Sequence, residues 1–414
     1  MIRMHHLKIV LLIGWRNVFR NKRRSLIVAS SIVVGLVVMM FSMAIMNGFN
    51  RQMLENTINT SLGHVAIHKK GFFNDMKLAL SFVPDDSLNA IKGIHGVGCI
   101  AQRVKFEAMV QSSRSSQGVL VMGIEPDKEK CVSNIYEYAG SDTRSFIMNS
   151  SSNDILISRS LAVKLGIGIG DKCVVMLQDI HGVLAAHAFI VKGLYQSPIE
   201  SFDKYVVYIG IRKAQEISGL GNAISEIIVR CADKDFADKV ASSIKSMNKA
   251  FLEVLTWKQM APQIVQAIKL FDTMMYVFLA IIFISIIFTI ANTMIMAIME
   301  RYREIGIMKS IGTQPSWIAA IVILEACGLG MLGIVAGIVI TYLLVVITGT
   351  TGINFAFYSQ SMRVWGTGTV VYPYLTATNV VVATTIVLCN TIIASLYPAY
   401  KAAKIKPLDA LHFI

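Results

Sequence analysis

Long apolar runs without charged side chains constrain this chain more than any other feature of its sequence. Residues 25–50, 273–299 and 380–397 contain no charged residue, and 317–348 contain only Glu325. A helix needs about 20 mostly apolar residues to cross a membrane. The sequence therefore predicts four transmembrane helices, at 25–46, 273–299, 317–347 and 378–398.

The composition agrees with a membrane protein and excludes several other classes. Hydrophobic residues make up 54% of the 414 residues and charged residues 16%, whereas a soluble globular protein carries about 25% charge. The absence of low-complexity tracts excludes collagen-like and disordered chains. The apolar run at 25–46 is longer than the core of a cleaved signal peptide, and no small-residue cleavage site follows it. We interpret it as an uncleaved anchor.

Lysine and arginine in the short segments predict the orientation of the helices. The loop 348–377 carries only Arg363, whereas segment 1–24, the loop 300–316 and the tail 399–414 carry thirteen basic residues together. Both termini and the 300–316 loop are therefore expected in the cytoplasm. The net charge of +13 then reflects orientation against anionic lipid and not nucleic-acid binding. The basic residues are Arg3, Lys8, Arg16, Arg20, Lys22, Arg23, Arg24, Arg301, Arg303, Lys309, Lys401, Lys404 and Lys406.

This orientation places residues 47–272 outside the cytoplasm, as a segment long enough to build its own core. Its 25 basic and 22 acidic residues are nearly balanced. Strand-like and helix-like patterns both occur, so a mixed α/β domain is expected. Strands are predicted at 65–68, 97–106, 119–124, 154–157, 173–178, 188–194, 205–209, 224–230 and 251–255, and helices at 159–165, 211–218 and 235–248.

Two segments next to the membrane have helical signals. Thr256 and Gln259 form a capping-box pattern, which predicts a helix that passes through Pro262 and joins the domain to the second span as a stalk. In segment 1–24, Leu11, Trp15 and Phe19 recur every four residues between arginines. That pattern predicts an amphipathic helix at the membrane surface, although a plain basic anchor fits it nearly as well.

No pattern in the sequence points to catalysis, or to a metal or cofactor on this chain. There is no Gly-Lys pair, and therefore no Walker-type phosphate loop. Gly166, Gly168 and Gly170 follow a predicted helix and precede a strand, the reverse of a dinucleotide loop, so we interpret them as turns. His64 and His68 are expected to have structural roles.

The six cysteines form no C-x-x-C pair, which argues against a zinc ribbon or a thioredoxin-type site. Cys99, Cys131, Cys173 and Cys231 lie in the predicted outer domain and can form up to two disulfides, whose pairing the spacing does not determine. The remaining two, Cys327 and Cys389, lie in apolar segments and are expected to pack there.

The third predicted span contains one acidic residue and a close-packing pattern. A buried carboxylate at Glu325 costs about 3 kcal/mol on insertion scales. It is either a proton relay or, as we favour, the partner of a neighbouring helix or of the cytoplasmic loop. Gly333 and Gly337 form a G-x-x-x-G step that permits close helix packing.

The 300–316 loop is predicted to contain a short helix that ends near Gly312, with Pro315 starting the next helix. Charged residues dominate its first turn, and apolar Ile305, Met308 and Ile311 follow. A connector of this length has no need for apolar residues facing water. The pattern predicts a helix that docks into a groove on a soluble partner.

Five segments together resemble the FtsX-like permease family of ABC transporters, which includes lipoprotein-releasing permeases and MacB-type exporters. The resemblance covers essentially the whole chain, and implies four transmembrane helices in a one-plus-three arrangement around a large MacB-like periplasmic α/β domain. The segments are 14–24 (GWRNVFRNKRR), 46–49 (MNGF), 63–67 (GHVAI), 300–312 (ERYREIGIMKSIG) and 397–411 (YPAYKAAKIKPLDAL).

The resemblance implies a permease subunit of the bacterial inner membrane that is not itself an enzyme. Such a subunit pairs with a second copy or a paralogue and works with separate ATPase subunits, which bind ATP and magnesium. The 300–316 loop would be the coupling helix that docks the ATPase. The residues that this implies for coupling are Glu300, Arg301, Arg303, Glu304, Ile305, Met308 and Lys309.

Lipoprotein release is the function that the resemblance favours, with lipoprotein as cargo and a periplasmic carrier as a further partner. Flexible methionines suit varied acyl chains, so a cargo cavity is predicted near the outer ends of the first two spans; ordinary packing explains these residues equally well. One lipoprotein-releasing permease recruits the carrier through a long hairpin, whereas the connection 178–187 here is short. The predicted cavity residues are Met39, Met40, Met43, Met46, Met274, Met275 and Phe278.

Two other functions of the family stay open at this point. One is an efflux or mechanotransmission pump, as in MacB-type members. The other is a regulator of cell-wall hydrolases, as in the division-associated members, whose outer domains are smaller than 47–272.

Overall fold

The computed structural model describes residues 22–85, 87–139, 151–247 and 251–408, and most of the predicted amphipathic segment 1–24 lies outside them. The chain divides into two compact units. The helical unit comprises Met1–Asn50, Ile268–Asn354 and Val370–Ile414, and the α/β unit comprises Arg51–Ala267 and Phe355–Thr369.

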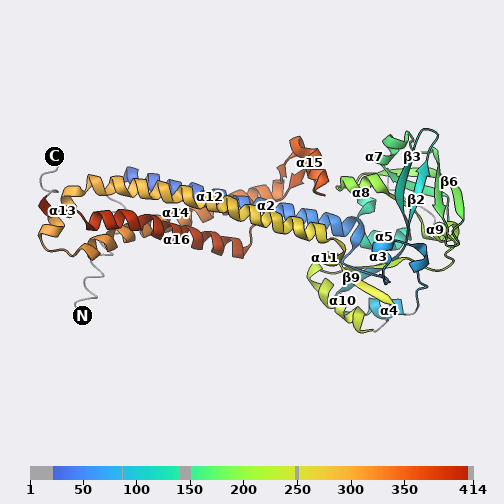
Figure 1. The fold of residues 1–414 in the computed structure, drawn as a ribbon. Coiled ribbons are helices and arrows are strands. Elements are labelled where there is room, and N and C mark those ends of the chain that lie inside the picture. The colour runs from blue at the N-terminus through green and yellow to red at the C-terminus, as the bar shows by residue number, and fades with distance from the viewer. Residues whose placement is uncertain (1–21, 86, 140–150, 248–250, 409–414) are drawn as a thin grey trace. The chain divides into compact units, whose positions relative to one another are not determined.

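Four long helices build the helical unit, and each contains one of the predicted spans (Figure 1). Within the described residues, these four helices are long and apolar enough to cross a membrane. Each helix extends beyond the span predicted within it. Their bounds are Lys22–Thr57 (α2), Pro262–Glu300 (α12), Pro315–Thr351 (α14) and Ala377–Ala403 (α16), and the short α13 spans Tyr302–Ser310.

Small and polar residues hold these helices together. A Cβ atom added to Gly333 or Gly337 of α14 would meet Ile32 or Leu36 of α2 at less than 3.0 Å, so both positions require glycine for the close approach that the G-x-x-x-G pattern predicts. The Asn390 side chain of α16 donates to the Phe283 carbonyl of α12 over 3.0 Å.

The stalk predicted before the second span consists of two helices instead of one. The capping box of Thr256 and Gln259 is present and starts α11 (Trp257–Met260). Ala261 then leaves the helical region, with φ −124° and ψ 60°, because the residue before a proline disfavours the helical conformation. Helix α12 begins at Pro262, where the missing N–H of proline removes no helical hydrogen bond.

The α/β unit contains all nine predicted strands in one sheet. The order of pairing is β3-β7-β4-β6-β5-β2-β8-β1-β9, and an additional β3–β2 pairing closes the strands from β3 to β2 into a ring. The strands are β1 (Val65–Lys69), β2 (Val97–Gln111), β3 (Ser116–Ile124), β4 (Asp154–Ser158), β5 (Lys172–Gln178), β6 (Leu184–Tyr195), β7 (Val206–Gly210), β8 (Glu226–Cys231) and β9 (Leu252–Thr256).

Strand β2 connects the two parts of this sheet. Its first half pairs with β8 and its second half with β5, while β3 runs antiparallel along residues 103–111. The apolar core of the unit lies beneath these strands and includes fully buried Val104, Phe106 and Val110 of β2.

Short helices cover the strands, and the predicted helices at 159–165 and 211–218 end at glycines as expected. Gly166 and Gly219 adopt positive φ of 65° and 72° and close α7 and α9. Gly168 and Gly170 lie in the turn that follows, which confirms them as turn residues. The helices are α3 (Phe72–Asp75), α4 (Ser87–Lys92), α5 (Pro126–Val132), α6 (Ile135–Tyr138), α7 (Arg159–Leu165), α8 (Glu200–Tyr205), α9 (Ile211–Ser218), α10 (Ala237–Ser246) and α15 (Ser359–Val364).

A buried ionic cluster attaches α5 to the sheet. Arg103 of β2 donates to both carboxylate oxygens of Glu129 on α5, at 2.6 and 3.1 Å, and both side chains are fully buried. Glu226 of β8 pairs with Arg103 and with Lys105. Burial alone would raise the pKa of Glu226, but the charges of Lys105 and Arg103 outweigh it and lower this pKa. Arg103 also donates to the Ser61 carbonyl at the end of the first long helix.

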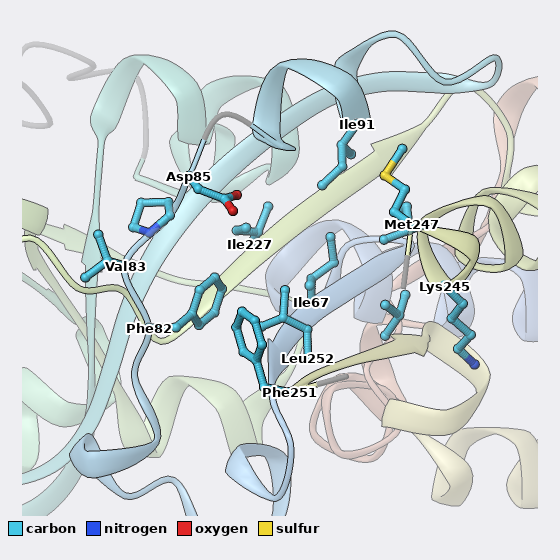
Figure 2. Close-up of a pocket in the computed structure, with 13 residues that line it drawn as sticks. Ile67, Phe82, Val83, Asp85, Ile91, Ile227, Lys245, Met247, Phe251 and Leu252 are labelled. Atoms are coloured by element: carbon cyan, nitrogen blue, oxygen red, sulfur yellow. The ribbon is translucent and has the colours of Figure 1, made fainter. Parts of the chain in front are cut away.

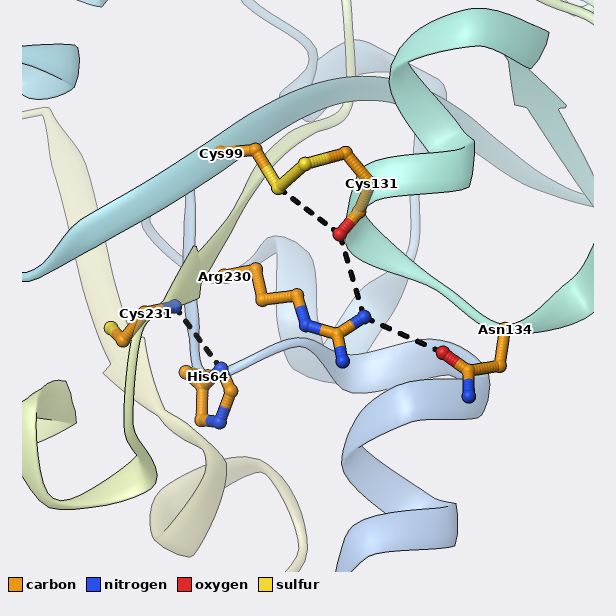
Figure 3. Close-up of a disulfide and its surroundings, with 6 residues drawn as sticks. All are labelled: His64, Cys99, Cys131, Asn134, Arg230 and Cys231. Carbon is orange, nitrogen blue, oxygen red and sulfur yellow. Dashed lines mark hydrogen bonds between the residues drawn. A yellow bond between two sulfur atoms is a disulfide. The ribbon is translucent and has the colours of Figure 1, made fainter.

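A disulfide between Cys99 and Cys131 joins the same two elements (Figure 3). Arg230 donates to the Cys131 carbonyl and to the Asn134 side chain, both at 3.4 Å. The backbone of Asn134 in turn donates to the Asn59 carbonyl over 2.8 Å. Helix α5 therefore connects the sheet with the turn at Ile58–Leu62 in which the first long helix ends. Cys173 and Cys231 are free and buried, so one of the two possible disulfides forms.

Candidate functional site

Helix α13 is the element that the sequence assigns to partner docking, and its ends are defined by local sequence. Arg301 is the residue before the helix. It does not adopt the helical conformation, since its φ is −106° and its ψ is 18°. After the helix, Gly312 has a φ of +96°, a conformation that glycine adopts without steric cost. Pro315 then starts α14 at its first position. The predicted short helix between the second and third spans is confirmed.

The inner face of α13 packs on the helical unit. Ile305 is 5% exposed and belongs to the core of that unit, while Tyr302 and Met308 are half-buried against it. Lys309 donates to the Ala403 and Ile405 carbonyls at 2.8 and 2.7 Å. The Ala403 carbonyl belongs to the last residue of α16, and the Ile405 carbonyl lies just beyond the C-cap Lys404. The lysine therefore satisfies a carbonyl that the helix end leaves without an intrahelical donor.

The start of α13 is fixed by an ion pair with the third span. Arg301 donates to Glu325 over 3.1 Å, and the two side chains are 11% and 5% exposed. This pair is the structural bond between Glu325 and the 300–316 loop that the sequence favours. Arg301 and Lys309 together hold α13 against α14 and α16.

Replacing Arg301 by alanine is expected to destabilise the helical unit by about 3–5 kcal/mol, because it leaves the buried Glu325 carboxylate without its charge partner. The double variant Arg301→Leu with Glu325→Leu removes both charges and is expected to recover most of that loss. Thermal unfolding of the purified chain in detergent measures both effects. A single variant as stable as the unaltered chain would contradict a structural role for the pair.

The outer face of α13 differs from the one inferred from the sequence. Ile307 is 41% exposed and Ile311 is 80% exposed, and charged Glu300, Arg303 and Glu304 are exposed beside them. Of the seven residues assigned to coupling, Arg301, Ile305, Met308 and Lys309 contact the chain's own helices. Ile307 was missed, although its i, i+4 spacing to Ile311 is a signal for one helical face.

The residues predicted to form a cargo cavity are not brought together on one surface. Met39, Met40 and Met43 are buried in the core of the helical unit, and Met275 packs against that core. Met46 is half-buried, whereas Met274 and Phe278 are exposed. Methionine supplies core packing here, the alternative that the sequence left equally open.

A groove of about 420 Å³ lies instead between α2 and α12, and none of the predicted cavity residues line it. Four hydroxyl side chains lie on its walls, and those of Ser30, Ser31 and Thr289 donate to carbonyls of their own helices. The lining residues are Ser30, Ser31, Val34, Gly35, Val38, Ile282, Ser285, Ile286 and Thr289.

The α/β unit has a smaller apolar pocket between β1, β9 and α10 (Figure 2). Ile67, Phe82 and Leu252 line it, and the Lys245 side chain is directed away from them. Its volume of about 110 Å³ is well below the 300–1,000 Å³ of typical cofactor and drug sites.

Two further predictions concern this unit. The connection between β5 and β6 is a tight turn, because Gln178 pairs with Leu184 and the Asp179 backbone donates to Val183; the expected short hairpin is confirmed.

His64 accepts from the Cys231 backbone over 3.1 Å, and His68 is buried beside Phe72 and Phe73. Across the described residues, no three His, Cys, Asp or Glu side chains group as metal ligands.

Known proteins match nearly the entire chain. Residues 25–247 match the MacB-like periplasmic core domain, and residues 276–407 match the FtsX-like permease C-terminal family. The lipoprotein-releasing system transmembrane protein LolC of Xylella fastidiosa is 24% identical and covers 92% of each chain. LolC of Neisseria meningitidis is 23% identical over 97% of this chain and 98% of that protein. LolE of Haemophilus influenzae is 23% identical over 96% and 98%.

The two family matches divide the chain between α10 and α12. The first contains most of α2 and the strands β1 to β8, and the second contains α13 and the helices on either side of it. Because the first match alone spans more than half of the residues, the chain belongs to the FtsX-like permeases that carry a MacB-like periplasmic core domain.

Proposed function

We propose that this chain is the permease subunit of an ABC transporter that releases lipoproteins from a bacterial inner membrane. Three relatives that cover more than nine-tenths of the chain are lipoprotein-releasing permeases. Efflux and the regulation of cell-wall hydrolases lack support of that extent. In this proposal the chain itself does not hydrolyse ATP, and a separate ATPase binds ATP and magnesium.

The outer face of α13 is the observation that carries the proposal. Ile307 is exposed on α13 and Ile311 at its C-cap, while the inner face of this helix is already packed. The charged side chains around the two isoleucines suit a polar interface rim. Because α13 is fixed to α14 by Arg301 and to α16 by Lys309, a push on its outer face would move these helices instead of bending the loop. Apolar anchors surrounded by charges are typical of helix-in-groove docking.

The proposal includes an orientation with both termini and α13 in the cytoplasm and with the α/β unit outside. Basic residues in the short segments support it. Cysteine labelling of intact spheroplasts with an impermeant reagent checks it. A cysteine introduced at Gly182, in the β5–β6 turn, is expected to react, and one at Lys404 is expected to react only after permeabilisation. The opposite result would reverse the topology and remove α13 from the ATPase.

We further propose that two permeases pair and that lipid-linked cargo enters between them near α2 and α12. The groove between these helices supports this location, since its hydroxyl groups can bind polar parts of a lipid anchor while its apolar residues contact acyl chains. A photocrosslinker at Val34, which is 60% exposed in this groove, is expected to capture lipoprotein. The matched control at Met274 lies on the exposed surface outside the groove and is expected to capture only phospholipid.

Purification of the tagged full chain tests the composition of the complex. The proposal expects an ATPase, a second permease copy or paralogue, and lipid-linked protein in the purified material. Recovery with a membrane-fusion adaptor and without lipoprotein would favour efflux, and recovery with a cell-wall hydrolase would favour regulation.

A further inference from the structure

The loop between the third and fourth long helices exposes an unusual set of apolar side chains. Within residues 355–369, Phe357 is 91% exposed, Tyr358 57%, Val364 61% and Trp365 43%. The rings of Phe357 and Tyr358 pack edge to face, with centroids 5.1 Å apart. Exposed aromatic residues in this number, on one short segment, indicate contact with something apolar.

The only charged residue of this loop forms an ion pair with an aspartate of the α/β unit. Arg363 is the one charged residue between 348 and 377, and it donates to Asp203 over 2.7 Å. The Asp203 side chain is 1% exposed and also accepts from the Ser197 backbone. Because Asp203 neutralises the arginine, the exposed part of the loop carries no net charge that would oppose its transfer out of water.

Hydrogen bonds hold the loop in this conformation. The Phe355 backbone donates to the Thr369 carbonyl over 2.7 Å and closes the loop at its base. The Asn56 side chain donates to the Gly366 carbonyl over 2.9 Å, and Gly366 adopts a φ of +73°. The aromatic residues are therefore exposed on an ordered segment, which loses little conformational entropy on binding.

The place of the loop in the chain indicates what covers it. Helix α14 ends at Thr351 and α16 begins at Ala377, so a few residues on each side connect the loop to helices that cross the membrane. Tryptophan and tyrosine concentrate at membrane–water interfaces, where their rings contact acyl chains and their polar groups stay hydrated. A segment tethered there meets lipid before any soluble partner.

We propose that Phe357, Tyr358, Val364 and Trp365 insert into the headgroup region of the adjacent membrane leaflet, as an interfacial anchor of the α/β unit. The Arg363–Asp203 ion pair makes this possible, since it removes the one charge from the inserting surface and joins the anchor to the unit. This anchor does not depend on the cargo or on ATP, so the proposal stands or falls separately from lipoprotein release.

Spin labels on the full chain in phosphatidylcholine–phosphatidylglycerol vesicles test the anchor. Phe357→Cys and Tyr358→Cys are labelled in a background that carries Cys327→Ala and Cys389→Ala. Cys173 and Cys231 stay unlabelled, because burial raises the pKa of each thiol to about 11 and leaves almost no reactive thiolate at pH 7. Val163→Cys is the reference, since Val163 is 82% exposed on α7 of the same unit.

At Phe357 and Tyr358, collisions with lipid-soluble oxygen are expected to exceed collisions with a water-soluble nickel complex several-fold, with the ratio reversed at Val163. Nickel accessibility at both loop positions equal to that at Val163 would overturn the proposal. Protection from nickel that arises only after the ATPase, a second permease or lipoprotein is added would also overturn it, and would assign the aromatic residues to a protein partner.

Discussion

Replacing Ile307 and Ile311 by aspartate is expected to abolish ATPase binding while the permease stays folded and inserted in the membrane. Both side chains are exposed, Ile307 on α13 and Ile311 at the C-cap of this helix, so their replacement removes no contact from the core of the helical unit. Loss of an apolar anchor from a desolvated interface commonly costs about 2 kcal/mol or more, and a buried aspartate adds a desolvation cost. A loss of about 2 kcal/mol already weakens binding roughly 30-fold.

Ile305→Asp is the matched control, on the same helix and with the same change. Ile305 is 5% exposed in the core of the helical unit, so this variant is expected to lower the yield of folded protein instead of separating folding from ATPase binding. Co-purification of the ATPase and cargo-stimulated ATP hydrolysis measure coupling, and size-exclusion chromatography measures folding. If the Ile307/Ile311 variant binds and couples normally, α13 is only a connector.

The second large effect is expected from Glu129→Ala in the buried cluster of the α/β unit. This change leaves Arg103, which is 1% exposed, without its bidentate partner, and breaking a buried pair from one side costs about 3–5 kcal/mol. The control Glu55→Ala breaks a pair with Arg51 at 2.7 Å whose side chains are about half exposed, and such pairs contribute at most about 1 kcal/mol. Unfolding followed by tryptophan fluorescence distinguishes the two.

The disulfide gives this prediction an internal check. Cys99–Cys131 attaches α5 to β2 independently of Glu129, and closing a loop of this size stabilises by about 4 kcal/mol. Reduction is therefore expected to destabilise Glu129→Ala further, because α5 then loses both attachments. Equal stability of Glu129→Ala and Glu55→Ala would show that the ionic cluster does not hold α5.

The strands were predictable because each is marked by local pattern and bounded by turn residues. The run at 205–209 is predicted as a strand from its local pattern alone, and the structure places β7 (Val206–Gly210) between β3 and β4. The errors are at boundaries that depend on tertiary contacts. Strand β6 begins at Leu184 instead of 188, since pairing with Gln178 extends it.

The site was less predictable because its chemistry depends on contacts distant in sequence. Ile305 and Ile307 are equally apolar, and only the packing of α13 on the helical unit decides which of them is exposed. Lys309 caps α16 almost a hundred residues away, and Arg363 pairs with Asp203 across 160 positions. Sequence patterns report the period of an element, but they do not report which neighbour covers each face.

ATP-dependent release of lipoprotein from proteoliposomes is the direct test of whether this chain is a lipoprotein-releasing permease. The vesicles contain this permease with its co-purified partners and a lipoprotein, and an apolar-lined acceptor is added outside to collect released cargo. We expect release that requires ATP, a lipid-anchored substrate and the unaltered Ile307/Ile311 surface, and no release of the same protein without its lipid. Equal transport of an unlipidated substrate, or ATP hydrolysis by a complete complex without any release, would contradict it.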